Sequence, residues 1–167
     1  YKHIQAGLDL RRPVQIHKIR NAFEKSSTVL VHGASGQGKS TLSYRYAHDH
    51  YPAGYAFEVI LEEGDAWVLD IRQAGTALAR PFSFPFLLLL DVPPGNESWV
   101  FLAKQLTDIP NCHVLVTFRE EDLNRSSSVE EFTRAVTVKL DLRKLEAEEL
   151  FSRLRKQGVL SDFLGFT

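Results

Sequence analysis

The chain has 167 residues, 44% of them hydrophobic, and a formal net charge of −1, which fits about one folded domain. A net charge so close to zero gives no reason to expect general nucleic-acid binding, and no apolar run approaches the ~20 residues of a membrane span. The single cysteine, Cys112, excludes an internal disulfide framework and favours a reducing, cytoplasmic compartment. Because the sequence contains no methionine, we expect it to be a fragment of a longer, multidomain protein.

The first elements along the chain are a helix, a strand and a second helix. Pro13 suits the first turn of a helix, and residues 14–25 keep their apolar positions at helical spacing. Residues 28–32 form an apolar run of strand length. A glycine-rich stretch follows, and the next helix is predicted over residues 39–50 because Pro52 stops it.

The rest of the chain alternates strands with helices. Further strands are predicted at 55–61, 86–90, 114–118 and 136–140. One helix is expected to begin at an Asp65 cap and to bury a face made of Trp67, Ile71, Ala74 and Leu78. Two more are expected from Ser98 and over 146–157, whereas the polar, serine-rich residues 120–128 indicate a loop or a frayed helix.

This alternation predicts an α/β fold with a parallel sheet and helices on both faces. The strands at 28–32, 86–90 and 114–118 are apolar on both faces, as central parallel strands are. The strands at 55–61 and 136–140 carry polar residues on one face, which is typical of sheet edges. A three-layer fold with a five-stranded sheet of order 5-1-4-3-2 satisfies this pattern.

The glycine-rich stretch fits the pattern G-x-x-x-x-G-K-[ST]. Glycines let the backbone curl until several N–H groups point at one phosphate, and the following helix directs its positive dipole end to the same place. The pattern predicts that Lys39 reaches the outer phosphates of a nucleotide and that the Ser40 hydroxyl binds Mg²⁺. The candidate phosphate-binding residues are Gly33, Ala34, Ser35, Gly36, Gln37, Gly38, Lys39, Ser40 and Thr41.

Two strand ends supply further candidates. Asp91 ends the apolar run 86–90 and resembles the acid of a Walker B motif, so we expect it to hold Mg²⁺ together with Ser40 and to serve catalysis. ATPases with this motif commonly carry a second acid at the next position, where this sequence has Val92. At the end of the next strand, Thr117 is a candidate for orienting water and Arg119 for pairing with phosphate oxygens. The alternative is that Arg119 makes an exposed salt bridge with Glu120 or Asp122.

The order of the three motifs, at 33–41, 87–91 and 114–119, resembles the STAND class of signal-transduction ATPases, relatives of the NB-ARC ATPases. The resemblance implies a P-loop NTPase core in which Arg119 senses the γ-phosphate. It also implies that the segment 12–16, with Arg12 and Val14, contributes to an adenine pocket.

The implied division of the chain is an adenine-side segment at 1–27, a nucleotide-binding core at 28–145 and the start of a helical lid at 146–167. In proteins of this class, nucleotide binding and slow hydrolysis control self-association and an effector. The amino-acid sequence of the loop is most similar to that of bacterial members of the class, including those used in antiviral defence. Sensor and effector domains would lie outside this chain.

ATP or ADP with Mg²⁺ is the expected ligand, because no [NT]-K-x-D stretch is present to recognise guanine. The alternative functions are an ordinary P-loop ATPase or a small-molecule kinase that acts on a separate substrate. A nucleotide-loaded switch without significant hydrolysis also stays open, and Val92 favours it.

Overall fold

The computed structural model describes residues 2–7, 9–62, 66–123 and 135–156. Its centre is a five-stranded sheet in which every neighbouring pair of strands is parallel. The order is β2-β3-β4-β1-β5, which is the predicted order read from the other edge. The strands are β1 (Thr28–Gly33), β2 (Ala56–Val59), β3 (Phe86–Asp91), β4 (Cys112–Arg119) and β5 (Val136–Lys139).

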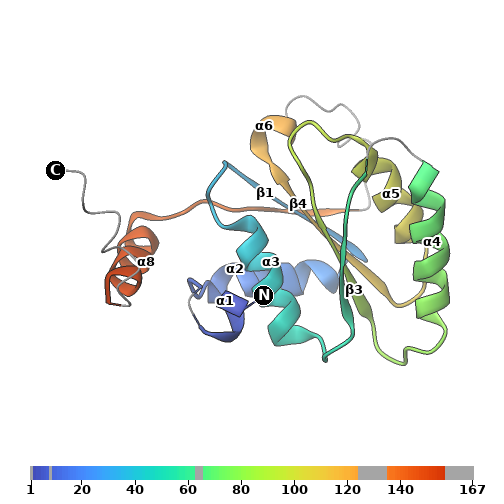
Figure 1. Ribbon diagram of the computed structural model, residues 1–167, viewed down its shortest axis with the longest axis horizontal. Coiled ribbons are helices and arrows are strands. Elements are labelled where there is room, and N and C mark those ends of the chain that lie inside the picture. Colours follow the sequence, from blue (N-terminus) through green and yellow to red (C-terminus); the bar gives the residue numbers. More distant parts are fainter. Residues whose placement is uncertain (1, 8, 63–65, 124–134, 157–167) are drawn as a thin grey trace.

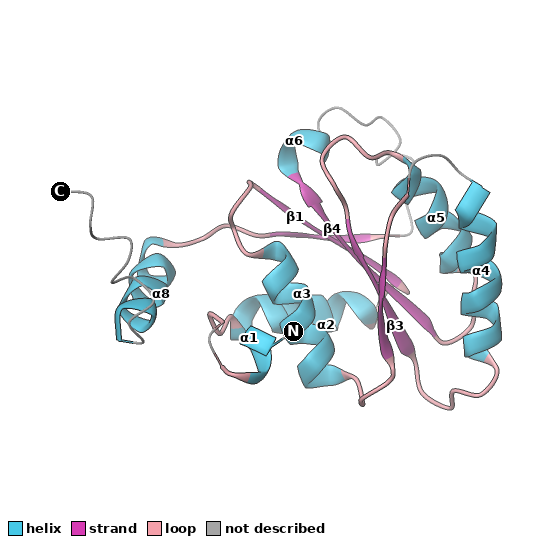
Figure 2. Ribbon diagram, viewed as in Figure 1, coloured by secondary structure: helices cyan, strands magenta, loops and turns pink. Residues whose placement is uncertain are grey.

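Helices cover both faces of this sheet, as predicted (Figures 1 and 2). Helices α1, α2 and α3 lie on one side, and α4 and α5 lie on the other. α8 follows an extended segment and contacts the part of the chain before α2 through Glu146 and Arg153. The helices are α1 (Lys2–Gln5), α2 (Pro13–Phe23), α3 (Lys39–His50), α4 (Ala66–Ala79), α5 (Ser98–Thr107), α6 (Glu120–Leu123) and α8 (Lys144–Lys156). None of the helices in the described ranges is both long and apolar enough to cross a membrane.

Alternate residues of the central strands belong to two separate hydrophobic cores, one on each face of the sheet. Leu88 and Leu90 of β3 join the core under α4 and α5, whereas Leu87 and Leu89 join the core under α2 and α3. Because both faces of β3 are buried, its side chains from Phe86 to Leu90 are all apolar. This two-sided burial confirms that the longest apolar runs of the sequence mark the central strands.

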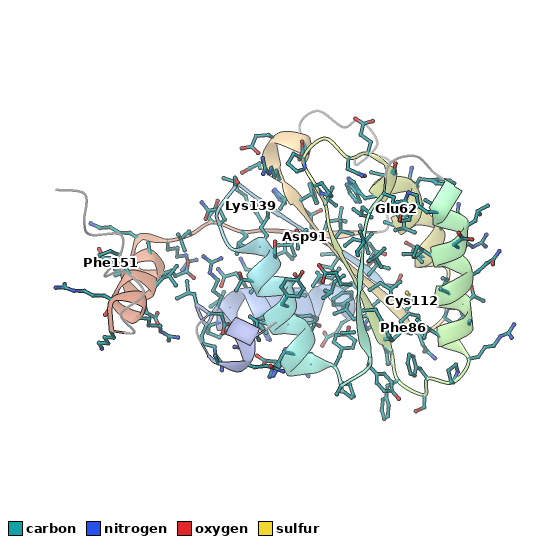
Figure 3. All side chains as sticks on the ribbon, in the orientation of Figure 1. Glu62, Phe86, Asp91, Cys112, Lys139 and Phe151 are labelled. Atoms are coloured by element: carbon teal, nitrogen blue, oxygen red, sulfur yellow. The ribbon has the colours of Figure 1, made fainter. Side chains whose placement is uncertain are left out.

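The strand register aligns the carboxyl ends of the three central strands. Asp91 pairs with Thr117 across β3 and β4, and Gly33 pairs with Arg119 across β1 and β4. Figure 3 shows Asp91 at the opposite end of β3 from Phe86. The residues singled out in the sequence therefore meet at one edge of the sheet, where ligands bind in open α/β folds.

Several predicted boundaries need correction. β2 ends at Val59 rather than at residue 61, and Ile60 is exposed, because an edge strand is paired on one side only. The buried face of α4 contains Gly75 in place of Ala74, which is exposed. α8 begins at Lys144 rather than at residue 146, whereas α6 at the start of the stretch 120–128 agrees with the frayed-helix alternative.

Some predictions fall on residues outside the described ranges. These are the Asp65 cap, most of the 120–128 loop, and the end of the last helix with the segment that follows it.

Candidate functional site

The phosphate loop joins the end of β1 to the start of α3. Gly38 is the N-cap of α3 with a left-handed φ of 78°, and no side chain caps the helix. The N–H groups of Lys39, Ser40 and Thr41 occupy the first turn of α3, where a helix offers them no acceptor four residues earlier. They are therefore available to an anion placed at the mouth of the loop.

Gly33 opens the loop, and its lack of a side chain is a packing requirement. A Cβ atom at this position would overlap the backbone carbonyl oxygen of Leu140, just after β5. The Leu140 N–H donates to the His32 carbonyl at 2.7 Å, which fixes the two segments against each other. Gly33 is thus held by the close approach of two backbones as well as by the loop.

Lys39 is buried and faces back into the loop. Its Nζ atom donates to the carbonyl oxygens of Gly33 and Ala34, both at 2.9 Å. Burial lowers the pKa of Lys39, the charge of Asp91 opposes that shift, and the charge of Arg119 adds to it. The ammonium group is therefore poorly hydrated and close to other charges, a setting that favours a strong interaction with phosphate oxygens.

Asp91 is an exposed carboxylate held by its neighbour on β4. The Thr117 hydroxyl donates a hydrogen bond to Asp91 Oδ1, and the Thr117 carbonyl accepts one from the Val92 N–H at 2.8 Å. The side chains of Thr117 and Val92 are both buried. Thr117, a candidate for orienting water, is thus committed to orienting Asp91.

These residues line one cleft of 470 Å³. Lys39, Ser40, Asp91 and Arg119 meet in it, although they come from separate parts of the sequence. No ion pair joins Arg119 to another described residue, and Glu120 instead pairs with Lys139 at 2.7 Å. The lining consists of Ser35, Gly36, Gly38, Lys39, Ser40, Thr41, Asp91, Val92, Pro93, Pro94, Phe118 and Arg119.

Arg12 connects the segment before α2 to the phosphate loop. Its Nη1 atom donates to the Gln37 carbonyl at 2.7 Å, and its Nη2 atom lies 3.6 Å from Glu146 Oε2 of α8. Burial lowers the pKa of Arg12, and the charge of Glu146 opposes that shift. The Nε atom of Arg12 is buried without a partner among the described residues.

A second cavity of 180 Å³ lies on the Arg12 side of the loop. It includes Arg12, as the sequence led us to expect of a nucleobase pocket, but Val14 is 53% exposed and does not line it. Its lining is Asp9, Leu10, Arg12, Gly36, Gln37, Gly38, Thr41, Leu42, Leu142 and Leu150. Sequence reasoning missed Leu142 and Leu150 because no local pattern connects them to the loop.

The donor set fits a nucleotide with a magnesium ion. Ser40 and Asp91 offer hard oxygen ligands in the same cleft, and Mg²⁺ is usually bound by one or two protein groups plus phosphate oxygens. Within the described ranges no group of three or more His, Cys, Asp or Glu side chains could hold a metal by itself. A metal at this site would therefore depend on oxygens from the ligand.

The sequence matches no protein-family model, and none of the curated proteins gives a significant sequence match. Solved structures do match the fold. A Walker-type ATPase of Pyrococcus abyssi superposes with a TM-score of 0.55 and 14% identity, over 90% of this chain and 59% of that one. Hsp104 of S. cerevisiae, in its casein complex, gives a TM-score of 0.57 and 12% identity, over 93% of this chain and 32% of that one.

A DNA polymerase III gamma subunit-related protein of Thermotoga maritima gives a TM-score of 0.53 and 18% identity, over 78% of this chain and 47% of that one. This chain spans less than two thirds of the length of each of these neighbours. Identities this low carry information about the fold alone. The chain has the three-layer α/β fold of the P-loop NTPases.

Proposed function

We propose that this chain is the nucleotide-binding module of a STAND-class signalling ATPase that binds ATP or ADP with Mg²⁺. The observation that carries the proposal is the cleft in which Lys39, Ser40, Asp91 and Arg119 converge on the mouth of the phosphate loop. A lysine, a hydroxyl, a carboxylate and a guanidinium are the groups needed to hold a polyphosphate and its metal. The same groups are the parts on which phosphoryl transfer depends.

Each residue has a distinct proposed role. The N–H groups of the loop and Lys39 hold the phosphates, Ser40 and Asp91 bind the metal, and Arg119 pairs with the terminal phosphate. When bound, the metal would neutralise phosphate charge. The base would enter the cavity beside Arg12, whose Nε atom has no partner among the described residues. Val14 was expected in that pocket and would have to act from outside its present lining.

Slow turnover is part of the proposal. Asp91 is the one carboxylate among the residues that line the cleft, and the next position is the buried, apolar Val92. Positioning of water by a base contributes much of the rate in phosphoryl transfer. A site that holds the phosphates but lacks this base retains its nucleotide, which suits a switch more than a metabolic ATPase.

We place this switch in a longer protein in which residues 1–27 and 146–167 flank the nucleotide-binding core. In that setting, nucleotide exchange would control self-association and an effector, with bacterial antiviral defence as the proposed context. Sedimentation of the full-length protein with ATP and with ADP tests this finer assignment. A mass that does not depend on the nucleotide would favour an ordinary ATPase or a small-molecule kinase.

The binding assignment is tested by the substitution Lys39→Ala. Loss of a charge-assisted contact in a desolvated site should weaken ATP–Mg²⁺ binding by roughly 3 kcal/mol, or about 100-fold. Isothermal titration calorimetry measures the affinity, and Lys18→Ala, on the exposed side of α2, is the matched control. Thermal unfolding of both variants checks the fold. An unchanged affinity in folded Lys39→Ala would overturn the assignment.

A further inference from the structure

Another cavity in the described part of the chain shares no lining residue with the nucleotide cleft. It encloses 590 Å³, within the range of small-molecule pockets. Helix α3 separates the two, because it begins at Lys39 in the nucleotide cleft and ends at His50 in this cavity (Figure 1). The lining residues are Arg20, Phe23, Glu24, Tyr46, Asp49, His50, Tyr51, Pro52, Phe84, Pro85 and His113.

Stacked rings form the floor of this cavity. Phe23 lies 4.6 Å from the ring of His113 with an interplanar angle of 17°, and 5.7 Å from the ring of Tyr46. Tyr46 lies 4.6 Å from His50 in turn. The Tyr51 hydroxyl and His113 Nδ1 are hydrogen-bonded at 2.6 Å, which fixes the imidazole against Phe23. These rings hold one another in fixed positions and give the cavity an aromatic floor.

Burial favours the neutral forms of the titratable rings in the floor. Burial lowers the pKa of His113, and burial also lowers that of His50, where Asp49 and Arg20 act in opposite senses. Burial raises the pKa of Tyr46 to about 12 and raises that of Tyr51 further. Neutral imidazoles and phenols suit an uncharged ring as the buried part of a ligand.

The rim carries one cation and one anion that other described residues leave unpaired. Asp49 is committed, since its carboxylate lies 3.2 Å from Arg45, 2.9 Å from His48 and 3.8 Å from Arg11. Arg20 and Glu24 make no ion pair within the described ranges. They stand four residues apart at the end of α2, a spacing that puts two side chains on the same helix face about 5–6 Å apart.

We propose that this cavity binds a small aromatic zwitterion, the chemistry of an aromatic amino acid. The planar ring would stack in the aromatic floor, Arg20 would pair with the carboxylate, and Glu24 would pair with the ammonium group. Phe84 is 63% exposed at the cavity, and a bound ring would cover it. This site is distinct from the proposed nucleotide site, because the two share no lining residue.

Calorimetric titration of the whole chain with L-phenylalanine and L-tryptophan tests the proposal. A ligand of this size should bind with a dissociation constant of about 1 mM or tighter. Three probes each remove one feature. They are 3-phenylpropionate, which lacks the ammonium group, phenethylamine, which lacks the carboxylate, and L-leucine, which lacks the ring. Each should bind about tenfold more weakly than L-phenylalanine.

Variants of exposed residues locate the site without disturbing the core. Arg20→Gln, Glu24→Gln and Phe84→Ala should each weaken L-phenylalanine binding about tenfold. Arg80→Gln and Phe101→Ala, which lie outside the cavity, should leave it unchanged, and so should Lys39→Ala.

Each possible result either supports or overturns the proposal. Binding that needs the ring, both charges and all three cavity residues supports the proposal. Absence of saturable binding, equal binding of L-leucine, or binding that none of the three variants weakens would overturn it. Loss of amino-acid binding in Lys39→Ala would also overturn it, because the two sites would then not be separate. Failure of ATP to bind would leave this result unaffected.

Discussion

Thr117 holds Asp91 through a hydrogen bond that crosses from β4 to β3. The hydroxyl donates to Asp91 Oδ1, the two residues are paired in the sheet register, and the Thr117 side chain is 1% exposed. One carboxylate oxygen thus accepts a hydrogen bond within the sheet edge, while Asp91 lines the cleft. Such an arrangement fixes the direction in which Asp91 offers a ligand, as neighbouring hydrogen bonds do in metal sites.

The first prediction concerns this hydrogen bond. Thr117→Val should weaken the effect of Mg²⁺ on ATP binding about tenfold, because Asp91 loses its orienting donor while the packing volume is kept. Thr117→Ser retains the hydroxyl and should behave like the parent chain. Titration of Mg²⁺ at fixed ATP measures the effect, with Asp91→Asn as the reference for complete loss. Identical magnesium dependence in Thr117→Val and the parent would contradict the positioning role.

The second prediction concerns Gly33. A methyl group there meets the Leu140 carbonyl oxygen, so Gly33→Ala must displace backbone and should cost roughly 3 kcal/mol of stability. Ser35→Ala, in the exposed part of the same loop, should change stability by no more than about 0.5 kcal/mol. Urea denaturation of both variants gives the comparison. Equal stability of the two would show that β1 and the Leu140 segment are not in close contact.

The third prediction concerns the buried pair between Asp9 and Arg45. The guanidinium Nε atom donates to Asp9 Oδ2 at 2.7 Å, and both side chains are buried. Asp9→Asn should destabilise the chain by roughly 3–5 kcal/mol, because it leaves the buried Arg45 guanidinium with only the more exposed Asp49 carboxylate. Asp49→Asn removes a more exposed partner of the same arginine and should cost no more than about 1 kcal/mol.

The pair also predicts a dependence on acid. Burial raises the pKa of Asp9, but the hydrogen bond and the charge of Arg45 outweigh it and leave the pKa below the ordinary value of 3.8. Since the folded pKa is the lower one, the stabilisation is complete above 3.8 and is lost as the pH falls through the folded value. Melting temperatures measured from neutral to strongly acidic pH should fall more for the parent than for Asp9→Asn. Parallel curves would exclude Asp9 as the source.

The fourth prediction is that the chain binds ATP and hydrolyses it slowly. Val92 follows Asp91 at the position where ATPases with a Walker B motif commonly carry a second acid. Val92 is 6% exposed and apolar, so it offers nothing to a water molecule. Phosphate release at saturating ATP and Mg²⁺ should stay well below the ~1 per second of slow working enzymes. Turnover at or above that rate would favour the ordinary ATPase over the switch.

The order of the sheet and the phosphate loop could be predicted because both depend on local pattern. Continuous apolar runs identify strands buried on two faces, and the loop residues are adjacent in the sequence. The face of α4 could not be predicted so well. A Cβ atom at Gly75 would lie 3.0 Å from Ile109 Cδ1, just after α5. Close packing at this point therefore determines which face of α4 is buried. Hydrophobic spacing alone favours Ala74 over a glycine.

The candidate site was likewise predictable only in part. Lys39, Ser40, Asp91 and Arg119 line one cleft as expected, since each stands next to a strand end or a helix start. The bond from Thr117 to Asp91 and the cavity lining by Leu150 depend on side-chain contacts between distant segments. Val14 is exposed instead of lining the expected adenine pocket. Its apolar character and its position in the segment do not determine which way its side chain faces.

Gln37 lies at a junction between the two ends of the fold. Its carbonyl accepts from Arg12, before the first strand, and its side-chain oxygen accepts from the Leu142 N–H, 105 residues further along the chain. In mechanical terms, a pull on either segment loads the phosphate loop through single hydrogen bonds, whereas each strand of the sheet is held by a ladder of them. Under tension on either segment, the loop should therefore shift before the sheet separates. If the loop holds phosphate as proposed, its contacts to phosphate would then change.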